Sequence, residues 1–291
     1  MKSTPPQISQ TLTHTIDEID AEALNPKALQ PQSYRLAFDD PEFLTRKETR
    51  GIRFQLELLK PELEQEARGI HQTVVVYGSA RIVDAEAAAT MLKDAIELGE
   101  EQAIAMAERA VRNAVYYEKA RAFANMVARD CESESEEKRF VICTGGGPGI
   151  MEAANRGAYE AGALNVGLNI TLPHEQSGNR YITPGLSFKF HYFALRKMHF
   201  LIRAKALVVF PGGFGTLDEL FEVLTLVQTG KAKRLPIVLF GSDYWKRILN
   251  LDVLVEEGMI SALDLELINY CDEPQQAWDA IRSFYQTEKT A

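Results

Sequence analysis

The sequence contains no run of apolar residues long enough to cross a bilayer as a helix. It also lacks an excess of basic residues, because 32 lysines and arginines stand against 41 acidic residues and the formal net charge is −9. Non-specific nucleic-acid binding relies on a basic surface, which this chain does not indicate. The polar start from Met1 to Pro5 has no signal-peptide core. We therefore expect a cytoplasmic protein whose partners include neither a membrane nor a nucleic acid.

Cysteine is scarce, and histidine lacks the spacing of metal ligands. The three cysteines, Cys131, Cys143 and Cys271, are odd in number and widely spaced, which favours reduced thiols over a disulfide framework or a zinc site. None of the five histidines forms an H-x-x-x-H pair with another. We therefore expect no metal and no other cofactor.

The common cofactor and hydrolase fingerprints are missing as well. In the turn from Gly145 to Ile150, isoleucine occupies the place of the last glycine of the dinucleotide motif G-x-G-x-x-G. No Lys-Ser or Lys-Thr pair closes a glycine-rich loop as the Walker motif requires. Ser79 does not stand in the G-x-S-x-G elbow of a serine hydrolase. An NAD oxidoreductase, a P-loop ATPase and a serine hydrolase are therefore disfavoured.

The chain does have two glycine-rich turns, each directly after an apolar run. Residues 144–149 (TGGGPG) follow the run 140–143, and residues 211–216 (PGGFGT) follow the run 206–210. Where a buried strand ends and a helix begins, unpaired N–H groups and the helix dipole favour a phosphate. Glycine also simply permits tight turns, which is the plainer interpretation of one such loop. Two loops at corresponding strand ends favour phosphate binding, and hence a nucleotide.

Apolar strands alternate with helical segments over most of the chain. Strands are expected at 73–77, 140–144, 165–170, 206–210 and 236–240, and helices near 149–162, 190–203 and 216–229, with a polar loop after residue 170 and two helices at the end. This alternation predicts an α/β fold, a Rossmann-like, doubly wound parallel sheet with helices on both faces. Ligands of such folds bind beyond the carboxyl ends of the strands, where both glycine turns and Gly78-Ser79 would lie.

Two regions fall outside this alternation. Residues 1–69 are expected to form an N-terminal arm and a helix that Pro61 should break or kink, followed by a Rossmann-like nucleotide-binding domain over 70–291. Within that domain, about 84–135 is an expected helical insertion, because the stretch is alanine-rich and only Gly99 interrupts its helical composition. We expect a long helix or a helical hairpin there, with the acidic stretch 132–137 as a solvated connection.

Charged residues beside the second glycine turn suggest sugar chemistry. Asp218 and Glu219 would repel a phosphate unless they act on another part of the ligand, and a carboxylate over a ribose could stabilise positive charge at the anomeric carbon. Arg196, followed by Lys197, could bind a phosphate or orient such a carboxylate. Two plainer interpretations stand beside these: Thr216 and Glu219 fit a capping box, and Arg196-Lys197 fits a solvent-facing helical stretch.

Together these motifs resemble the LONELY GUY (LOG) family of Rossmann-like phosphoribohydrolases, long labelled lysine decarboxylases. The resemblance rests on Gly78-Ser79-Ala80, 145–152 (GGGPGIME), Arg196-Lys197 and 211–219 (PGGFGTLDE), and it covers roughly 70–80 and 140–245. No lysine stands in a pyridoxal-phosphate context, so decarboxylation finds no support. The resemblance implies hydrolysis of a purine nucleoside 5′-monophosphate, AMP or an N6-modified AMP of the cytokinin type, to free base and ribose 5-phosphate.

The resemblance also implies a role for each matching residue. Arg196 and Glu219 would be the catalytic pair: Glu219 would stabilise the ribosyl cation or orient the attacking water, and Arg196 would position the ligand and the carboxylate. Gly213, Gly215 and Thr216 would hold the phosphate. The full expected substrate- and phosphate-binding set is Gly78, Ser79, Gly146, Gly147, Met151, Glu175, Lys197, Gly212, Gly213, Gly215, Thr216 and Thr225.

Family members are dimers, so the resemblance implies a homo-oligomer, a dimer or higher, with the pocket near the subunit interface. Phe200 stands where the family usually has methionine, which is expected to reshape the base end of the pocket. Tyr192, Phe193 and Phe200 could flank a base or belong to the core. Related Rossmann-like proteins bind nucleotides or molybdenum cofactor without cleaving them. A non-catalytic binding or sensing protein is therefore the alternative, motivated by the added arm and insertion.

Overall fold

The computed structural model describes residues 34–171 and 178–288, and the chain divides into two compact units, 1–55 and 56–291. The described part of the first unit holds the 3-10 helix η1 (Ala37–Asp39), α2 (Pro41–Thr45) and the start of α3 (Arg50–Glu66). The Asp40 carboxylate accepts hydrogen bonds from two N–H groups of the first turn of α2, whose first residue is a proline. The expected arm falls mostly outside the described residues.

Helix α3 continues through Pro61 to Glu66, so the expected break at this proline is wrong. Pro61 is buried, and its carbonyl accepts a hydrogen bond from the side-chain amide of Gln65, which is also buried. A proline inside a helix removes one backbone hydrogen bond, and packing of its ring can offset that loss. The helical pattern of apolar residues on either side of Pro61 therefore outweighs the helix-breaking tendency of this one proline.

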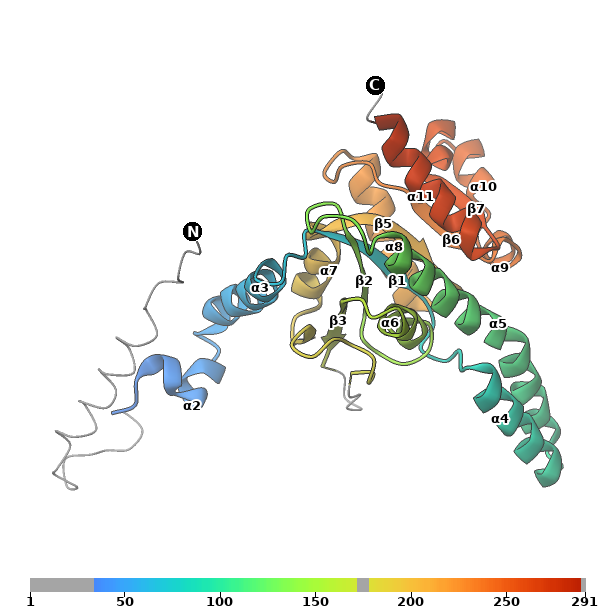
Figure 1. Ribbon diagram of the computed structural model, residues 1–291, viewed down its shortest axis with the longest axis horizontal. Helices are drawn as coiled ribbons and strands as arrows, with labels where there is room; N and C mark the ends of the chain where they lie inside the picture. Colours follow the sequence, from blue (N-terminus) through green and yellow to red (C-terminus); the bar gives the residue numbers. More distant parts are fainter. Residues whose placement is uncertain (1–33, 172–177, 289–291) are drawn as a thin grey trace. The chain divides into compact units, whose positions relative to one another are not determined.

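The second unit is built on a seven-stranded sheet in the order β4-β3-β2-β1-β5-β6-β7 (Figure 1). All neighbouring strands pair in parallel. The central strand β1 lies between β2 and β5, so the chain winds outward from it in both directions. This confirms the predicted α/β, Rossmann-like doubly wound fold, and it places the ligand crevice beyond the carboxyl ends of these three strands. The strands are β1 (Gln72–Tyr77), β2 (Phe140–Thr144), β3 (Asn165–Ile170), β4 (Ser187–Phe190), β5 (Ala204–Val209), β6 (Ile237–Phe240) and β7 (Ile268–Cys271).

The sequence patterns do not predict β4 and β7, the two edge strands. β4 falls in the segment expected to be a polar loop, and β7 falls where only helices were expected. Each has four residues, of which two in β4 and three in β7 are fully or partly exposed, so neither carries the continuous apolar run of a central strand. Short edge strands of this kind are fixed by pairing with a neighbour and not by their own composition.

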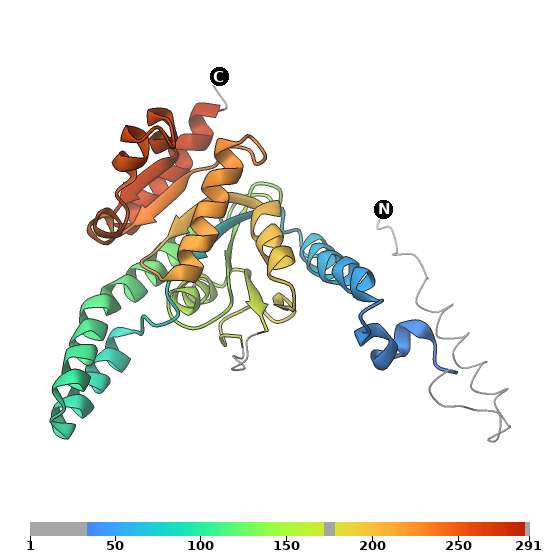
Figure 2. The ribbon, with the colours of Figure 1, turned by 180° about the vertical axis from the view of Figure 1, so that it is seen from behind.

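Helices cover both faces of the sheet (Figures 1 and 2). One face is covered by α5 (Glu101–Asp130), α6 (Ile150–Glu160) and α11 (Pro274–Glu288), which bury Phe123, Ile150 and Trp278. The other face is covered by α7 (Phe193–Ile202), α8 (Phe214–Gln228) and α9 (Ser242–Ile248), which bury Phe200, Leu220 and Trp245. Two further elements, α10 (Leu251–Glu256) and η2 (Ala262–Leu267), lie between α9 and β7. The two cores leave the carboxyl edge of the strands open for a site.

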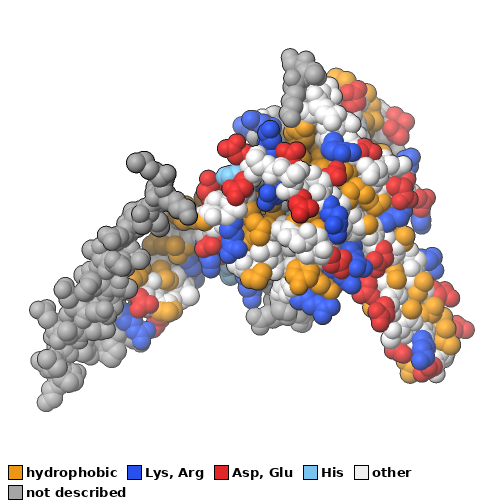
Figure 3. Space-filling view, viewed as in Figure 1, with side chains coloured by type: hydrophobic (Ala, Val, Ile, Leu, Met, Phe, Trp, Pro, Cys, Tyr) orange, Lys and Arg blue, Asp and Glu red, His pale blue; other side chains and the backbone are white. Residues whose placement is uncertain are grey.

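The expected insertion is a helical hairpin of α4 (Ala85–Leu98) and α5. Gly99 ends α4 in the left-handed conformation, with φ of 73°, and its N–H bonds back to the last turn. Farther along, α5 crosses α6 so closely that a Cβ on Gly157 would overlap the Arg121 carbonyl. The acidic connection after α5 is exposed, as expected. The hairpin also exposes apolar side chains (Figure 3): Met91, Ile96, Leu98, Met106, Val111 and Val115.

Acidic and basic side chains are intermixed on the face of the molecule that Figure 3 shows. Within residues 34–171 and 178–288, no helix combines the length and the apolar character that a bilayer crossing demands. The helical hairpin is instead held by the packing of α4 on α5 and of α5 on α6.

Candidate active site

Three loops meet at the carboxyl edge of the sheet, those after β1, β2 and β5. The N–H of Ser79 donates to the carbonyl of Pro211 over 3.0 Å, and the N–H of Ile150 donates to the carbonyl of Ser79 over 3.1 Å. Gly149 has φ of 72°, and a Cβ there would overlap the Ser79 carbonyl oxygen. Gly78 is equally confined, since a Cβ would lie 2.6 Å from the Ile150 side chain. The β1 loop thus joins the two glycine turns, and glycine is required for that approach.

A buried network of polar side chains holds the first glycine turn. The hydroxyl of Thr144 donates to Oδ1 of Asn155 over 2.7 Å and accepts from the N–H of Gly146 over 3.0 Å. The amide of Asn179 donates to the same Asn155 oxygen over 2.9 Å and to the carbonyl of Gly147 over 3.1 Å. The Gly146 N–H is therefore occupied within the protein. No motif in the sequence marks Asn155 or Asn179, so sequence reasoning missed both.

The second glycine turn differs from the expectation at its junction with the helix. Helix α8 begins at Phe214 and its N-cap is Gly213, so Thr216 lies inside the first turn and is buried. The capping box expected between Thr216 and Glu219 is therefore wrong, because the helix starts before the threonine. Gly213 and Gly215 are exposed, with nothing within 4 Å of a Cβ built on either. Their N–H groups lie at an open helix N-terminus, which suits an anion.

Thr216 instead packs under the turn. A Cβ on Gly212 would overlap the Thr216 side chain, and the Gly212 carbonyl accepts a hydrogen bond from the Tyr244 hydroxyl over 2.6 Å. Gly212 is thus needed for a close approach, whereas its neighbours leave space for a ligand. The second turn is anchored on one side and open on the other.

Arg196 of α7 and Glu219 of α8 lie together at this edge. Nη2 of Arg196 donates to Oε1 of Glu219 over 2.9 Å, and the two side chains are only 11% and 13% exposed. Burial raises the pKa of Glu219 to about 7, although Arg196 acts in the opposite direction, and Asp218 adds to the rise. A carboxyl with this pKa can take up and release a proton near neutral pH.

The guanidinium of Arg196 lies among aromatic rings and reaches toward the first glycine turn. Its Cζ is 5.0 Å from the ring centroid of Phe193 and 5.6 Å from that of Phe200. A Cβ built on Gly145 would lie 3.8 Å from its Nη1. Its Nε is buried and has no hydrogen-bond partner among the described residues. Arg196 thus spans the space between the two turns and retains an unused donor.

Lys197 forms a second, more exposed connection between α7 and α8. Its Nζ lies 2.9 Å from a carboxylate oxygen of Asp218 and 3.0 Å from one of Glu222. These contacts raise the pKa of Lys197 against the effect of its burial, which lowers it. Lys197 is therefore engaged by the protein, and the interpretation of Arg196-Lys197 as a solvent-facing pair is wrong for both residues.

The structure gathers most of the expected site residues at one edge. Gly78, Ser79, Gly146, Gly147, Met151, Arg196, Lys197, Gly212, Gly213, Gly215, Thr216 and Glu219 all belong to the loops and helix ends just described. Thr225 is different: it is exposed near the end of α8, and its hydroxyl donates to the Phe221 carbonyl of its own helix. Glu175 lies outside the described residues.

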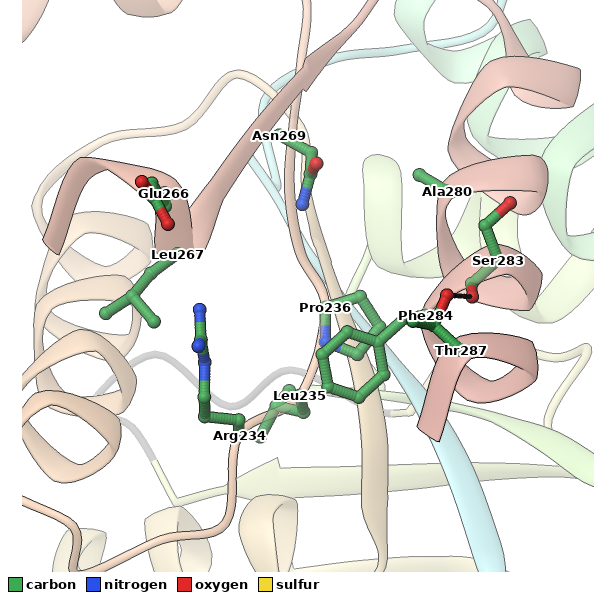
Figure 4. Close-up of a pocket in the computed structure, with 10 residues that line it drawn as sticks. All are labelled: Arg234, Leu235, Pro236, Glu266, Leu267, Asn269, Ala280, Ser283, Phe284 and Thr287. Carbon is green, nitrogen blue, oxygen red and sulfur yellow. Dashed lines mark hydrogen bonds between the residues drawn. The ribbon is translucent and has the colours of Figure 1, made fainter. Parts of the chain in front are cut away.

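A pocket of about 540 Å³ lies at the opposite end of the strands (Figure 4). It opens beside the amino ends of β6 and β7 and the last turns of α11, and its lining includes Arg234, Asn269 and Phe284. Because the strands are parallel, this pocket is separated by the length of the sheet from Arg196 and Glu219. It is not part of the site at the glycine turns.

A family model described as "Possible lysine decarboxylase" matches residues 151–281. The chain is also similar to "Cytokinin riboside 5'-monophosphate phosphoribohydrolase LOG7" of Arabidopsis thaliana, with 31% identity over 141 residues, 47% of this chain and 63% of the relative. With LOG3 of the same plant it shares 30% identity over 146 residues, 48% of this chain and 66% of the relative. The chain therefore covers slightly less than two thirds of these relatives' length.

Among solved structures, a molybdenum cofactor binding protein from the phototrophic bacterium Rippkaea orientalis is similar, with a TM-score of 0.44 and 16% identity. The alignment covers 73% of this chain and 95% of that one. The match to the family model lies over α6 to α11, the region that contains Arg196, Glu219 and the second glycine turn.

Proposed function

We propose, because this chain belongs to the LONELY GUY (LOG) family, that it hydrolyses the N-glycosidic bond of a purine nucleoside 5′-monophosphate. The substrate would be AMP or an N6-modified AMP, and the products the free base and ribose 5-phosphate. The observation that carries the proposal is the contact between Arg196 and Glu219, with a carboxyl pKa of about 7. This pair stands beside two glycine turns at the edge where such folds bind ligands.

The phosphate would bind at the N-terminus of α8. Gly213 and Gly215 are exposed there. Their N–H groups lie at the positive end of the helix dipole, which stabilises a bound anion. Gly212 and the buried Thr216 fix the turn from beneath. With the phosphate on this turn, Glu219, farther along the same helix, stands on the ribose side.

Positive charge develops at C1′ as the base departs, and the enzyme must stabilise it. Ionised Glu219 would stabilise the oxocarbenium-like state and accept a proton from the attacking water, whose oxygen forms the new bond to C1′. The C1′–N9 bond breaks, and its electron pair leaves with the base, which takes up that proton. Arg196 would hold the carboxylate in place and keep its ionised form accessible near neutral pH. No metal or cofactor is required in this scheme.

Incubation of the purified protein with AMP, GMP and N6-isopentenyl-AMP tests the proposal directly. We expect release of free base from at least one of these, measured by chromatography, and its loss in Glu219→Gln. Absence of base from every purine monophosphate, with a folded protein, would contradict the proposal. The non-catalytic alternative predicts instead that nucleotide binding, measured by calorimetry, occurs without turnover.

We further expect the protein to act in the cytoplasm as a homo-oligomer, a dimer or higher, with a purine nucleoside monophosphate as its small-molecule partner and no nucleic-acid partner. Light scattering of the full chain tests the oligomeric state. A monomer at the concentrations of the activity assay would contradict the expected homo-oligomer.

A further inference from the structure

We propose that Phe200 is a positioning residue for the Arg196–Glu219 pair, because its ring holds the guanidinium at the place where it meets the carboxylate. The inference rests on the proposed function. In the proposed hydrolysis, the Phe200 side chain touches neither the substrate nor the reacting atoms. It acts through Arg196.

The spacing on α7 brings the three side chains onto one side of the helix. Phe193 lies one turn before Arg196 and Phe200 one turn after it, and residues separated by three or four positions are neighbours on a helix surface. Both rings lie within 6 Å of the guanidinium carbon, at 5.0 and 5.6 Å, which is the range of a cation–π contact. The guanidinium therefore has an aromatic neighbour on each side along the helix axis.

The two rings are not equivalent. Phe193 is 51% exposed, so it has room to move, whereas Phe200 has no exposed surface. The Phe200 ring meets Tyr77 edge to face, with centroids 5.0 Å apart and an interplanar angle of 87°. Tyr77 ends the central strand β1 and is 3% exposed. Phe200 is thus the fixed ring, and it is fixed by the strand that leads into the Gly78-Ser79 loop.

Arg196 needs such support because its own bonding is sparse. Among the described residues its guanidinium makes one hydrogen bond, to Glu219, and its Nε makes none. A long, flexible side chain held by one hydrogen bond loses much rotamer entropy on ordering. A cation over a buried ring recovers part of that cost without occupying a donor. The face of Phe200 therefore keeps the arginine in place without a hydrogen bond to Nε or Nη1.

Replacement of Phe200 by pentafluorophenylalanine tests this, because the ring keeps nearly its shape while its face becomes positive. We expect kcat to fall about three- to thirty-fold, as the loss of a cation–π contact implies. We also expect the acidic limb of the pH–kcat profile to move to higher pH, because a displaced Arg196 no longer lowers the pKa of Glu219. The same replacement at Phe123, buried on the opposite face of the sheet, should change neither quantity. Unaltered kcat and an unmoved limb in the Phe200 variant would overturn the inference.

A second measurement separates this inference from the proposed function. The pKa of Glu219, followed by carbon NMR in the labelled full chain without substrate, should rise in the Phe200 variant and in Phe200→Leu. It should not move in the Phe123 variant. If the unaltered chain releases no base, the proposed function fails, and this titration alone decides on Phe200. A Glu219 pKa that is the same with and without the Phe200 ring would refute the positioning role whatever the activity.

Discussion

The hydroxyl of Thr144 donates a hydrogen bond to Oδ1 of Asn155 over 2.7 Å, and neither side chain has any exposed surface. The same asparagine oxygen accepts from Asn179, and its amide donates to Asn165 over 2.9 Å. One side chain of α6 therefore satisfies polar groups from β2, β3 and the segment before β4. The first glycine turn depends on this asparagine for its shape.

Asn155→Ala should destabilise the protein by about 2–4 kcal/mol, because it leaves several buried donors and acceptors without partners. Urea unfolding followed by circular dichroism measures this. Asn113→Ala is the matched control: Asn113 is exposed on α5, and its loss should change stability by no more than about 0.5 kcal/mol. Equal effects of the two substitutions would show that the network around Asn155 contributes nothing specific.

The central fold could be predicted from the sequence because its signals are local. Continuous apolar strands before Gly78, Gly145 and Gly212 indicate buried parallel strands, and each glycine marks a junction where the chain must turn closely. Arg196 and Glu219 could be predicted from the sequence only as members of two separate motifs, since 23 residues separate them in the chain. Their distance and burial come from the packing of α7 on α8.

Other features depend on contacts that no local pattern encodes. Thr216 and Glu219 have the spacing of a capping box, yet α8 starts at Phe214 with Gly213 as its N-cap, so Thr216 already lies inside the first turn. Pro61 suggests a helix break, yet packing carries α3 past it. β4 and β7 exist because an existing edge offers them partners. In each case tertiary packing overrides a correct local preference.

Glu219 should make folding stability fall as pH rises. Its pKa in the folded chain, about 7, lies above its ordinary value of 4.5, so the folded state binds the proton more tightly than the unfolded state does. The associated stability is fully present below pH 4.5 and is lost as pH rises through 7, a change of about 3 kcal/mol. Besides burial and Arg196, the charges of Asp218 and Glu222 raise the pKa of Glu219 and that of Lys197 lowers it.

The comparison of unfolding free energies between the unaltered chain and Glu219→Gln isolates this contribution, since glutamine does not titrate. The stability of the unaltered chain in excess of that of the variant should be greater at pH 5 than at pH 8 by about 2.5 kcal/mol. Glu160→Gln provides a control of opposite sign at lower pH. Hydrogen bonds from Arg121 and Arg156 outweigh burial and lower the pKa of Glu160, so its contribution to stability changes little between pH 5 and pH 8 and is lost as pH falls below 4.5. A pH-independent difference for Glu219→Gln would contradict a raised pKa.

Activity should require ionised Glu219, so kcat/KM for a purine nucleoside monophosphate should rise with pH and reach half its plateau near pH 7. In Glu219→Gln the rate should be roughly 10²- to 10⁴-fold lower and the limb should vanish, because no base and no negative charge remain. Glu222→Gln should retain the limb, shifted slightly to lower pH, since the charge of Glu222 contributes to the raised pKa of Glu219. A limb that persists in Glu219→Gln would assign the titration to another group.

Gly149 of the first glycine turn and Gly213 of the second should respond differently to alanine, because only Gly149 is sterically confined. Gly149→Ala places a side chain at φ of 72° and against the Ser79 carbonyl, so we expect a loss of about 2–4 kcal/mol in unfolding free energy. Gly213 has φ of −97° and no atom within 4 Å of a Cβ, so Gly213→Ala should fold with stability close to that of the unaltered chain. Its methyl group would nevertheless stand where the phosphate binds. The KM for the nucleotide should therefore rise roughly tenfold, as the loss of one charge-assisted hydrogen bond implies. If Gly213→Ala left KM unchanged, the phosphate would have to bind away from the N-terminus of α8.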